Sequence, residues 1–339
     1  MSLVKRQKTD NGYHKALAHS RLIGSTNAGE ILYNEAVVLE GHQGSVLSSS
    51  FSHNGDNIAS GGLDRTILLW KLPRSEEEET PNYGVIKGHK SAVTSVRWLY
   101  DDITLVSASA DTTIGFWDSE TGKRTKKCVG HELAVNEISV SKDSLALSAS
   151  DDGSACLWDQ RQKEATNKVT TEYPLLSCTF NNRGNTFYIG GIDPKIQAYD
   201  MRVMDKPVWT CEGQVDSITS IAINKDDSIL LSRSLNGALR TYSAREFVPE
   251  GIPRMNPYIY DGAPSGNEYQ LIRACFSTDN VSIASGSEDK TVTIWDYKSR
   301  KILSKISGHR GATLDIVYHP TERILASTST DGSIIVREI

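Results

Sequence analysis

The chain has 339 residues, of which 38% are hydrophobic and 23% charged, and its formal net charge is −5 at pH 7. Five basic and two acidic residues among the first 30 give that segment a charge of +3, so the remainder carries −8. A region with this negative charge is poorly suited to binding phosphates, because affinity for nucleic acids rests largely on lysine and arginine. We therefore expect any contact with RNA to be indirect or minor.

The cysteines indicate a reducing compartment rather than a disulfide framework. Their number is odd, none has Cys-x-x-Cys spacing, and several stand in apolar runs such as the one around Cys178. We interpret them as small buried hydrophobic residues, and we predict neither a metal site nor a cofactor. No apolar run reaches the length of a membrane span, and the N-terminus lacks the core of a signal peptide. We therefore expect a soluble, intracellular protein with no membrane contact.

The first segment of the chain, residues 1–33, is predicted to be a flexible basic extension. Its tract at residues 4–8, Val-Lys-Arg-Gln-Lys, has the composition of a nuclear localisation signal, although so short a run is common by chance. An apolar run at residues 36–39 follows and precedes the first Gly-His pair.

From residue 41 onwards, four residue types recur at fixed spacing. A Gly-His pair opens a unit, a Ser follows, an Asp stands four residues after the Ser, and a Trp stands six residues after the Asp. The complete sets are His42, Ser60, Asp64 and Trp70; His89, Ser107, Asp111 and Trp117; and His131, Ser148, Asp152 and Trp158. The same spacing identifies four less regular units further along, so that the units span approximately residues 41–71, 88–118, 130–159, 172–200, 213–243, 267–296 and 308–339.

The unit length and the local composition predict the fold. Units of roughly 40–45 residues, with short β-branched runs between Gly, Asn and Asp turns, are typical of WD-repeat arrays, in which each unit forms a four-stranded blade. In the first unit, strands are expected at residues 45–51, 57–61 and 66–70. The sequence thus resembles the WD-repeat family, and it predicts an all-β, seven-bladed β-propeller over residues 34–339.

The last unit lacks a fourth strand, because the sequence ends two residues after the seventh closing position at Arg337. An unfilled sheet edge is a liability, and the apolar run at residues 36–39 can fill it. We therefore expect an N-terminal strand to close the ring.

The set His42, Ser60 and Asp64 has the composition of a hydrolase triad, but its recurrence argues against catalysis. An enzyme needs one such set, whereas a propeller needs one in every blade. A buried carboxylate also requires hydrogen-bonding partners, which the His and Ser would provide. We interpret the sets as structural tetrads, predict no catalytic residue, and expect a non-enzymatic protein.

Units four to six depart from the tetrad pattern. The fourth keeps only Asp193, the fifth has Gln214 at the His position and Asn236 at the Asp position, and the sixth has Asn267 near its His position. Either these blades are held by packing alone, or the relaxed constraint accompanies a specialised surface.

Two loops interrupt the repeats. The acidic run at residues 76–79 is typical of a solvated loop, with docking on a basic partner as the alternative. Residues 244–270 are rich in Pro and Gly and form a long insertion, which is characteristic of a mobile or a functional segment. Its aromatic residues Tyr258 and Tyr260 are candidates for a partner-specific contact.

Three local strings carry a closer resemblance. Residues 62–70 (GLDRTILLW), residues 117–124 (WDSETGKR) with the Gly-His pair at 130, and the closing residues 338–339 resemble the WD-repeat proteins of the spliceosomal U5 small nuclear ribonucleoprotein. The resemblance runs from about residue 36 to the end. It implies a nuclear pre-mRNA splicing factor that is a non-enzymatic scaffold, bound to the large U5 scaffold protein as a monomer within a large complex.

The WD-repeat resemblance also implies candidate partner-binding positions. In that family, partners often contact the residue just before the tight-turn Asp, at the mouth of the ring. The corresponding residues here are Leu63, Ala110, Asp151, Ile192, Leu235, Glu288 and Thr330. Of these, Leu63, Ile192 and Leu235 would form an apolar interaction patch, unless each merely packs on its own loop.

A second class of function fits two short motifs. Residues 158–161 (WDQR) and 199–202 (YDMR) match the WDxR-like pattern of substrate receptors of cullin-4 ubiquitin ligases. This motif also occurs in propellers with other roles. A third reading, an RNA-binding propeller, is disfavoured by the acidic charge.

Overall fold

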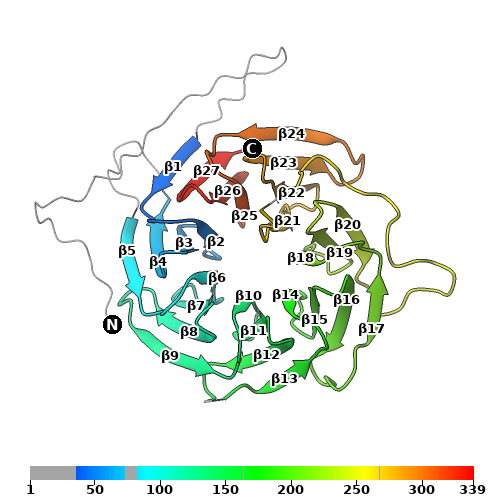
Figure 1. Cartoon of the computed structure of the whole chain (residues 1–339), viewed down its shortest axis with the longest axis horizontal. Helices are drawn as coiled ribbons and strands as arrows, with labels where there is room; N and C mark the ends of the chain where they lie inside the picture. The colour runs from blue at the N-terminus through cyan, green and yellow to red at the C-terminus, as the bar shows by residue number, and fades with distance from the viewer. Residues whose placement is uncertain (1–35, 73–81, 163, 267) are drawn as a thin grey trace, which may run out of the picture.

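The computed structural model describes residues 36–72, 82–162, 164–266 and 268–339, and the regular structure of these residues is entirely β-strand. Seven sheets stand as blades around a central axis (Figure 1), so the predicted seven-bladed β-propeller is confirmed. The predictions for residues 1–33, for the acidic run at 76–79 and for Asn267 lie outside the described residues.

Each blade is an antiparallel meander that runs outward from the axis. Blade one contains β2 (Val46–Phe51), β3 (Asn57–Gly62), β4 (Thr66–Lys71) and β5 (Asn82–Lys87), and blade two contains β6 (Val93–Trp98), β7 (Thr104–Ser109), β8 (Thr113–Asp118) and β9 (Arg124–Val129). Blade three contains β10 (Val135–Val140), β11 (Leu145–Ser150), β12 (Ser154–Asp159) and β13 (Asn167–Thr170), and blade four contains β14 (Leu175–Phe180), β15 (Thr186–Gly191), β16 (Lys195–Asp200) and β17 (Trp209–Glu212).

The remaining blades are less uniform. Blade five contains β18 (Ile218–Ile223), β19 (Ile229–Ser234) and β20 (Leu239–Ser243), and blade six contains β21 (Ala274–Phe276), β22 (Ser282–Gly286), β23 (Thr291–Asp296) and β24 (Ile302–Ser307). Blade seven contains β25 (Thr313–Tyr318), β26 (Ile324–Ser329), β27 (Ser333–Glu338) and β1 (Ala36–Glu40). The three strands predicted for the first unit are confirmed to within one residue at each end.

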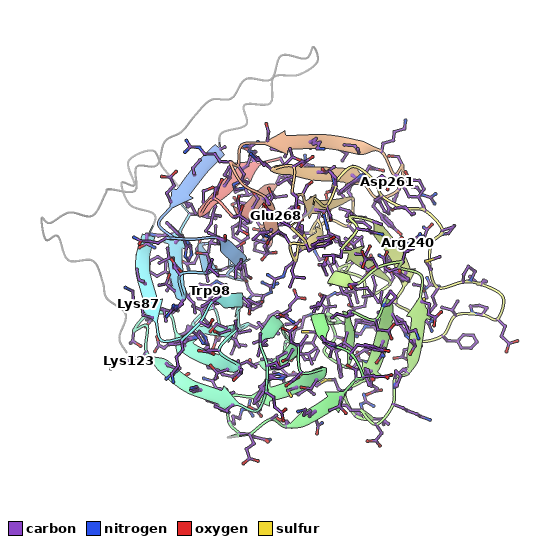
Figure 2. All side chains as sticks on the ribbon, viewed as in Figure 1. Lys87, Trp98, Lys123, Arg240, Asp261 and Glu268 are labelled. Atoms are coloured by element: carbon purple, nitrogen blue, oxygen red, sulfur yellow. The ribbon has the colours of Figure 1, made fainter. Side chains whose placement is uncertain are left out.

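The core lies between neighbouring blades. Middle strands such as β7 and β15 are buried along their whole length because sheets cover both of their faces, whereas the outer strands β9 and β24 are largely exposed. Trp98, which is labelled in Figure 2, belongs to the cluster between blades one and two, where it packs with Ile67 and Leu69. Its indole N–H donates to the Ser50 carbonyl oxygen at 3.2 Å.

The N-terminal strand closes the ring as predicted. Strand β1 pairs antiparallel with β27, from Ala36 opposite Arg337 to Glu40 opposite Ser333. Figure 1 shows this junction, where the first described strand lies beside the last. Leu39 is buried in the cluster that joins blades seven and one. Strand β1 therefore contributes both backbone hydrogen bonds and apolar burial to ring closure.

Side chains on the innermost strands tie each blade to the next. In five of the seven junctions, a backbone N–H of one inner strand donates to a side-chain oxygen of the neighbouring inner strand. The pairs are Val96 to Ser48, Cys178 to Glu137, Ile221 to Ser177, Ala274 to Ser220, and Ser49 to Asp315. Sequence spacing does not indicate these contacts, because each joins residues 41–54 positions apart or, in the last case, residues 266 positions apart.

A buried arginine crosses the axis of the ring. Arg273 precedes β21, and its guanidinium contacts the carboxylates of Glu137 and Asp315, each at 3.2 Å. The same guanidinium donates to the carbonyl oxygens of Leu47, Thr94 and Asn136, which belong to blades one, two and three. Arg273 thus connects blade six with four other blades through charge-assisted hydrogen bonds.

The insertion at residues 244–270 takes the place of a fourth strand in blade five. Its backbone bonds to β20 through Ser243 N–H to the Arg254 carbonyl and Tyr260 N–H to the Leu239 carbonyl, at 2.8 and 3.0 Å. The segment is irregular elsewhere and bulges away from the ring (Figure 1).

Candidate functional site

The seven candidate partner-binding residues occupy equivalent positions on one face of the ring. In every blade, the backbone N–H of this residue donates to a carbonyl of the loop that precedes the same blade, for example Leu63 to Ser45 at 2.9 Å and Ile192 to Pro174 at 3.1 Å. The same bond is made by Ala110, Asp151, Leu235, Glu288 and Thr330. These turns and the preceding loops therefore lie together, and we call this side the upper face.

The predicted tetrads of blades one to three are assembled beneath the upper face. In blade three, the Trp158 indole N–H donates to Ser148 Oγ at 2.8 Å, and Ser148 Oγ lies 2.7 Å from His131 Nε2. His131 Nδ1 lies 2.9 Å from Asp152 Oδ2. All four groups are satisfied when Ser148 donates to Nε2 and Nδ1–H donates to the carboxylate.

The other two tetrads repeat this geometry. The His–Ser distances are 2.8 Å for His42 and Ser60 and 2.7 Å for His89 and Ser107. Trp70 and Trp117 donate to the same serines at 2.8 and 2.7 Å. His42 and His89 lie 3.0 and 3.2 Å from Asp64 and Asp111. The Asp also accepts a backbone N–H from the residue after the His, so each tetrad holds the preceding loop on its own blade.

The surroundings of the tetrads keep the aspartates ionised. Burial alone would raise the pKa of Asp152, but hydrogen bonds from Ser154, the Glu132 backbone and His131 outweigh burial and lower it from 3.8 to about 2. The pKa values of Asp64 and Asp111 are lowered in the same way. Burial is also the main cause of the lowered pKa of His131, so this imidazole is neutral at pH 7.

The tetrad serines are poorly placed for nucleophilic catalysis. Ser60, Ser107 and Ser148 are fully buried, and each Oγ already accepts the indole N–H of its tryptophan. The geometry therefore supports the structural interpretation of these sets.

In blades seven and five, some tetrad positions hold other residues. Blade seven keeps His309 2.8 Å from Ser327 and 3.5 Å from Asp331, with Arg337 in place of the tryptophan. In blade five, Gln214 Nε2 donates to Ser232 Oγ at 2.6 Å and so replaces the imidazole.

Blade six uses a different arrangement. Arg233 of blade five is fully buried, and its Nε donates to Ser285 Oγ at 2.9 Å. The Trp295 indole N–H donates instead to the Asp261 carbonyl oxygen at 2.8 Å. The residue that precedes Trp295 by six, Asp289, pairs with Lys305 rather than with a histidine.

The apolar candidates on the upper face fall into two groups. Ile192 and Leu235 belong to the adjacent blades four and five, whereas Leu63 lies on blade one, on another part of the ring (Figure 1). Leu63 and Ile192 are 56% and 47% exposed, and Leu235 is half-buried. The fold therefore places blades two and three between Leu63 and Ile192, and an apolar patch formed by all three residues at the mouth of the ring stays a prediction.

A broader set of apolar side chains extends over blades three to six. They lie in the upper-face loops and turns, and each is at least two-fifths exposed. We call this set the upper apolar arc: Leu133, Tyr173, Ile192, Val215, Tyr269 and Leu271. Exposed apolar surface of this kind marks interaction sites, and the arc spans blade three, whose tetrad is intact, and blades four to six, whose tetrads are altered.

The aromatic residues of the insertion are not both on the surface. Tyr260 is 1% exposed, packs in the core with Trp295, and donates its hydroxyl to the Tyr297 carbonyl at 3.0 Å. Its candidacy for a partner contact is therefore wrong in this structure, because Tyr260 fills the fourth-strand position of blade five. Tyr258 is half-buried, with its hydroxyl 3.2 Å from the Arg300 carbonyl oxygen. The exposed aromatic side chains of the insertion among the described residues are instead Phe247, which is 78% exposed, and Tyr269, which is 70% exposed.

Both WDxR-like motifs end on exposed arginines. The Arg161 side chain is 84% exposed and lies 3.9 Å from Asp159, and Arg202 is exposed as well.

The cysteines and other chemical groups add few further candidates. All five cysteines are free; Cys128, Cys156 and Cys178 are buried, whereas Cys211 and Cys275 are only half-buried. Burial raises the pKa of Cys156 to about 11.

The described part of the chain contains no cluster of His, Cys, Asp and Glu suited to a metal ion. It also contains no helix long and apolar enough to cross a membrane.

Seven blades with recurring Trp–Ser–His–Asp tetrads define a WD-repeat β-propeller. In agreement, the family described as WD domain, G-beta repeat matches residues 34–71, 81–118, 122–159, 264–296 and 300–337. The matched segments omit blades four and five, which is where the tetrad is most altered.

Similarity to three known proteins defines the family of this chain within the WD-repeat proteins. The U5 small nuclear ribonucleoprotein 40 kDa protein of Dictyostelium discoideum is 33% identical over 99% of this chain and 93% of that protein. The Homo sapiens protein of the same name is 37% identical over 89% and 83%. The pre-mRNA-splicing factor cwf17 of Schizosaccharomyces pombe is 33% identical over 88% and 86%. The chain belongs to the family of U5 small nuclear ribonucleoprotein 40 kDa proteins.

Proposed function

We propose that this protein is a non-enzymatic interaction scaffold of the U5 small nuclear ribonucleoprotein that acts in pre-mRNA splicing in the nucleus. The observation that carries the proposal is the similarity to U5 40 kDa proteins along nearly the whole chain, at 33–37% identity. The relative named as a splicing factor, cwf17, matches 88% of this chain rather than one motif.

The upper apolar arc supports a scaffold role that depends on protein contacts. The arc exposes apolar side chains on four consecutive blades, and the acidic charge of the molecule disfavours direct binding to RNA. The partner that we propose is the large U5 scaffold protein, with the propeller present as one copy in the complex.

Affinity purification of the tagged protein, followed by mass spectrometry and RNA analysis, tests the proposal. We expect splicing proteins and U5 RNA to co-purify, with the large U5 protein retained at high salt. A preparation that contains neither splicing proteins nor U5 RNA would overturn it.

The second candidate is a substrate receptor of a cullin-4 ubiquitin ligase, which the exposure of Arg161 and Arg202 favours. A cullin adaptor in the same purification, lost on Arg161→Ala, would support this reading. RNA crosslinked to the isolated protein would instead indicate an RNA-binding propeller.

A further inference from the structure

Blade four contains a cavity at the position that a tetrad fills in other blades. Its volume is about 280 Å³. The lining combines charged, amide and aromatic groups: Glu172, Tyr173, Asp193, Lys195, Gln197 and Tyr199. This volume lies just below the range of roughly 300–1,000 Å³ that holds drug-sized ligands, so the cavity has room for one side chain.

The cavity exists because three tetrad positions have changed. Ile189 stands at the Ser position and Tyr199 at the Trp position. The loop at the His position turns away, since Thr171 bonds to the Gly153 carbonyl of blade three through both its N–H and its hydroxyl, at 2.7 and 2.8 Å. Among the described residues, therefore, no imidazole or indole lines this site.

Blade seven shows that losing the tryptophan does not by itself open such a space. There Arg337 replaces the tryptophan, His309 remains, and the cavity at the same place measures only about 10 Å³. The larger cavity in blade four therefore reflects the local replacement of the whole set rather than a general property of the irregular blades.

The charges at the blade-four cavity favour a cation. Glu172 is exposed and makes no hydrogen bond or ion pair with any described residue. Lys195 is already engaged, 3.3 Å from Glu212 and 3.9 Å from Asp193. The carboxylates of Glu172 and Asp193 in the lining, with that of the neighbouring Glu212, outnumber the single ammonium group of Lys195, which leaves an excess of negative charge.

The aromatic groups suit a planar cation. Tyr173 is 47% exposed in the loop that contributes to the cavity, and Tyr199 lies deeper at 4% exposure. The Tyr199 hydroxyl donates to Gln197 Oε1 at 2.9 Å, which orients the amide oxygen beside the cavity. A guanidinium group stacks on tyrosine rings and donates to carboxylate and amide oxygens in one plane, which a point-like ammonium cannot do.

We propose that this cavity receives an arginine side chain from a protein partner. The inference rests on the proposed scaffold function, and it adds the chemistry of one contact. Because Tyr173 also belongs to the upper apolar arc, the arginine would insert at the edge of a surface that covers apolar partner residues.

Titration with N-acetylarginine methylamide tests the cavity directly, with NMR of methyl-labelled isoleucines as the readout. Ile189 lines the cavity and Ile67 of blade one is remote from it. We expect saturable shifts at Ile189 in the millimolar range and none at Ile67. The uncharged citrulline analogue should bind about tenfold more weakly, because charge-assisted hydrogen bonds are lost. An N-acetylglutamate analogue should not bind.

The variant Tyr199→Trp fills the cavity with the residue that other blades use, and it should abolish the Ile189 shifts. Tyr242→Trp makes the same exchange in blade five and serves as the matched control, with normal binding expected. Equal responses to the arginine and citrulline analogues, or unchanged binding by Tyr199→Trp with a normal melting temperature, would overturn the proposal.

Purification of the same variants separates this inference from the proposed function. If wild-type protein recovers splicing proteins and Tyr199→Trp recovers them equally, the arginine contact is refuted and the scaffold function stands. If wild-type protein recovers none, the scaffold function itself fails.

Discussion

Replacing Asp111 with alanine removes the anionic end of the blade-two tetrad. Its carboxylate accepts hydrogen bonds from His89 at 3.2 Å, from the Lys90 backbone at 2.7 Å, and from Thr113 N and Oγ1 at 3.1 and 2.6 Å. The His89 side chain is only 1% exposed, so its Nδ1–H cannot turn to water when the carboxylate is gone.

The expected loss is set by the buried donors that the carboxylate leaves behind, which are His89 and Thr113. A hydrogen bond to a charged group is worth about 1.5–3 kcal/mol, whereas the more exposed Lys90 N–H can be satisfied by solvent. We expect Asp111→Ala to lower the free energy of unfolding by about that amount. Urea unfolding, followed by tryptophan fluorescence at pH 7, measures it from the midpoint and slope.

Asp289→Ala provides the matched control. Asp289 occupies the same sequence position in blade six, but its side chain is 30% exposed and pairs with Lys305 instead of a buried histidine. We expect a loss below about 1 kcal/mol there. Equal losses for the two variants, or a change for Asp111→Ala within about 0.5 kcal/mol of zero, would refute the role assigned to the tetrads.

Deletion of residues 34–40 should lower the melting temperature more than deletion of residues 1–30, because it removes the strand paired with β27; equal melting temperatures would contradict the closure of the ring. Arg273→Met should cost about 3–5 kcal/mol by leaving the buried carboxylate of Asp315 without its counter-ion and that of Glu137 with only Arg97 at 3.6 Å, and adding Glu137→Gln and Asp315→Asn should restore part of it; no recovery in calorimetry would argue against the central cluster. The unfolded chain binds more protons at acid pH, because His131 and Asp152 both have lowered pKa values when folded; stability should therefore decrease as pH falls below about 6.5 and more steeply from 3.8 towards 2, and a pH-independent unfolding midpoint would contradict this. Ile192→Asp should reduce recovery of splicing proteins without changing the melting temperature, and undiminished recovery would exclude Ile192 from the interface.

The repeats made the blades predictable. Each tetrad combines four residue types at nearly constant spacing, and the same hydrogen-bonded geometry recurs wherever all four are present. The closing strand was predictable from the number of strands in each unit, because a seventh blade without a fourth strand needs a strand from another part of the chain. The altered blades were also visible, since Gln214 and Asn236 break the pattern in the sequence itself.

Contacts between blades were not predictable from spacing. Arg273 reaches four other blades, and nothing in its local sequence marks it as the residue at the axis. Tyr260 looked like a surface aromatic because it lies in a Pro- and Gly-rich insertion, but the absent fourth strand of blade five left a place that it fills. The blade-four cavity depends on how the loop at Thr171 turns, which the sequence pattern does not encode.

Association with the U5 particle is the central claim, and sedimentation tests it most directly. Nuclear extract containing the tagged chain is separated on a glycerol gradient, and each fraction is assayed for the protein and for U5 RNA. We predict that the protein co-sediments with U5 RNA, and that antibody to the tag depletes U5 RNA from those fractions. Sedimentation of the protein as a free 37.3 kDa chain, with U5 RNA undisturbed by depletion, would contradict the claim.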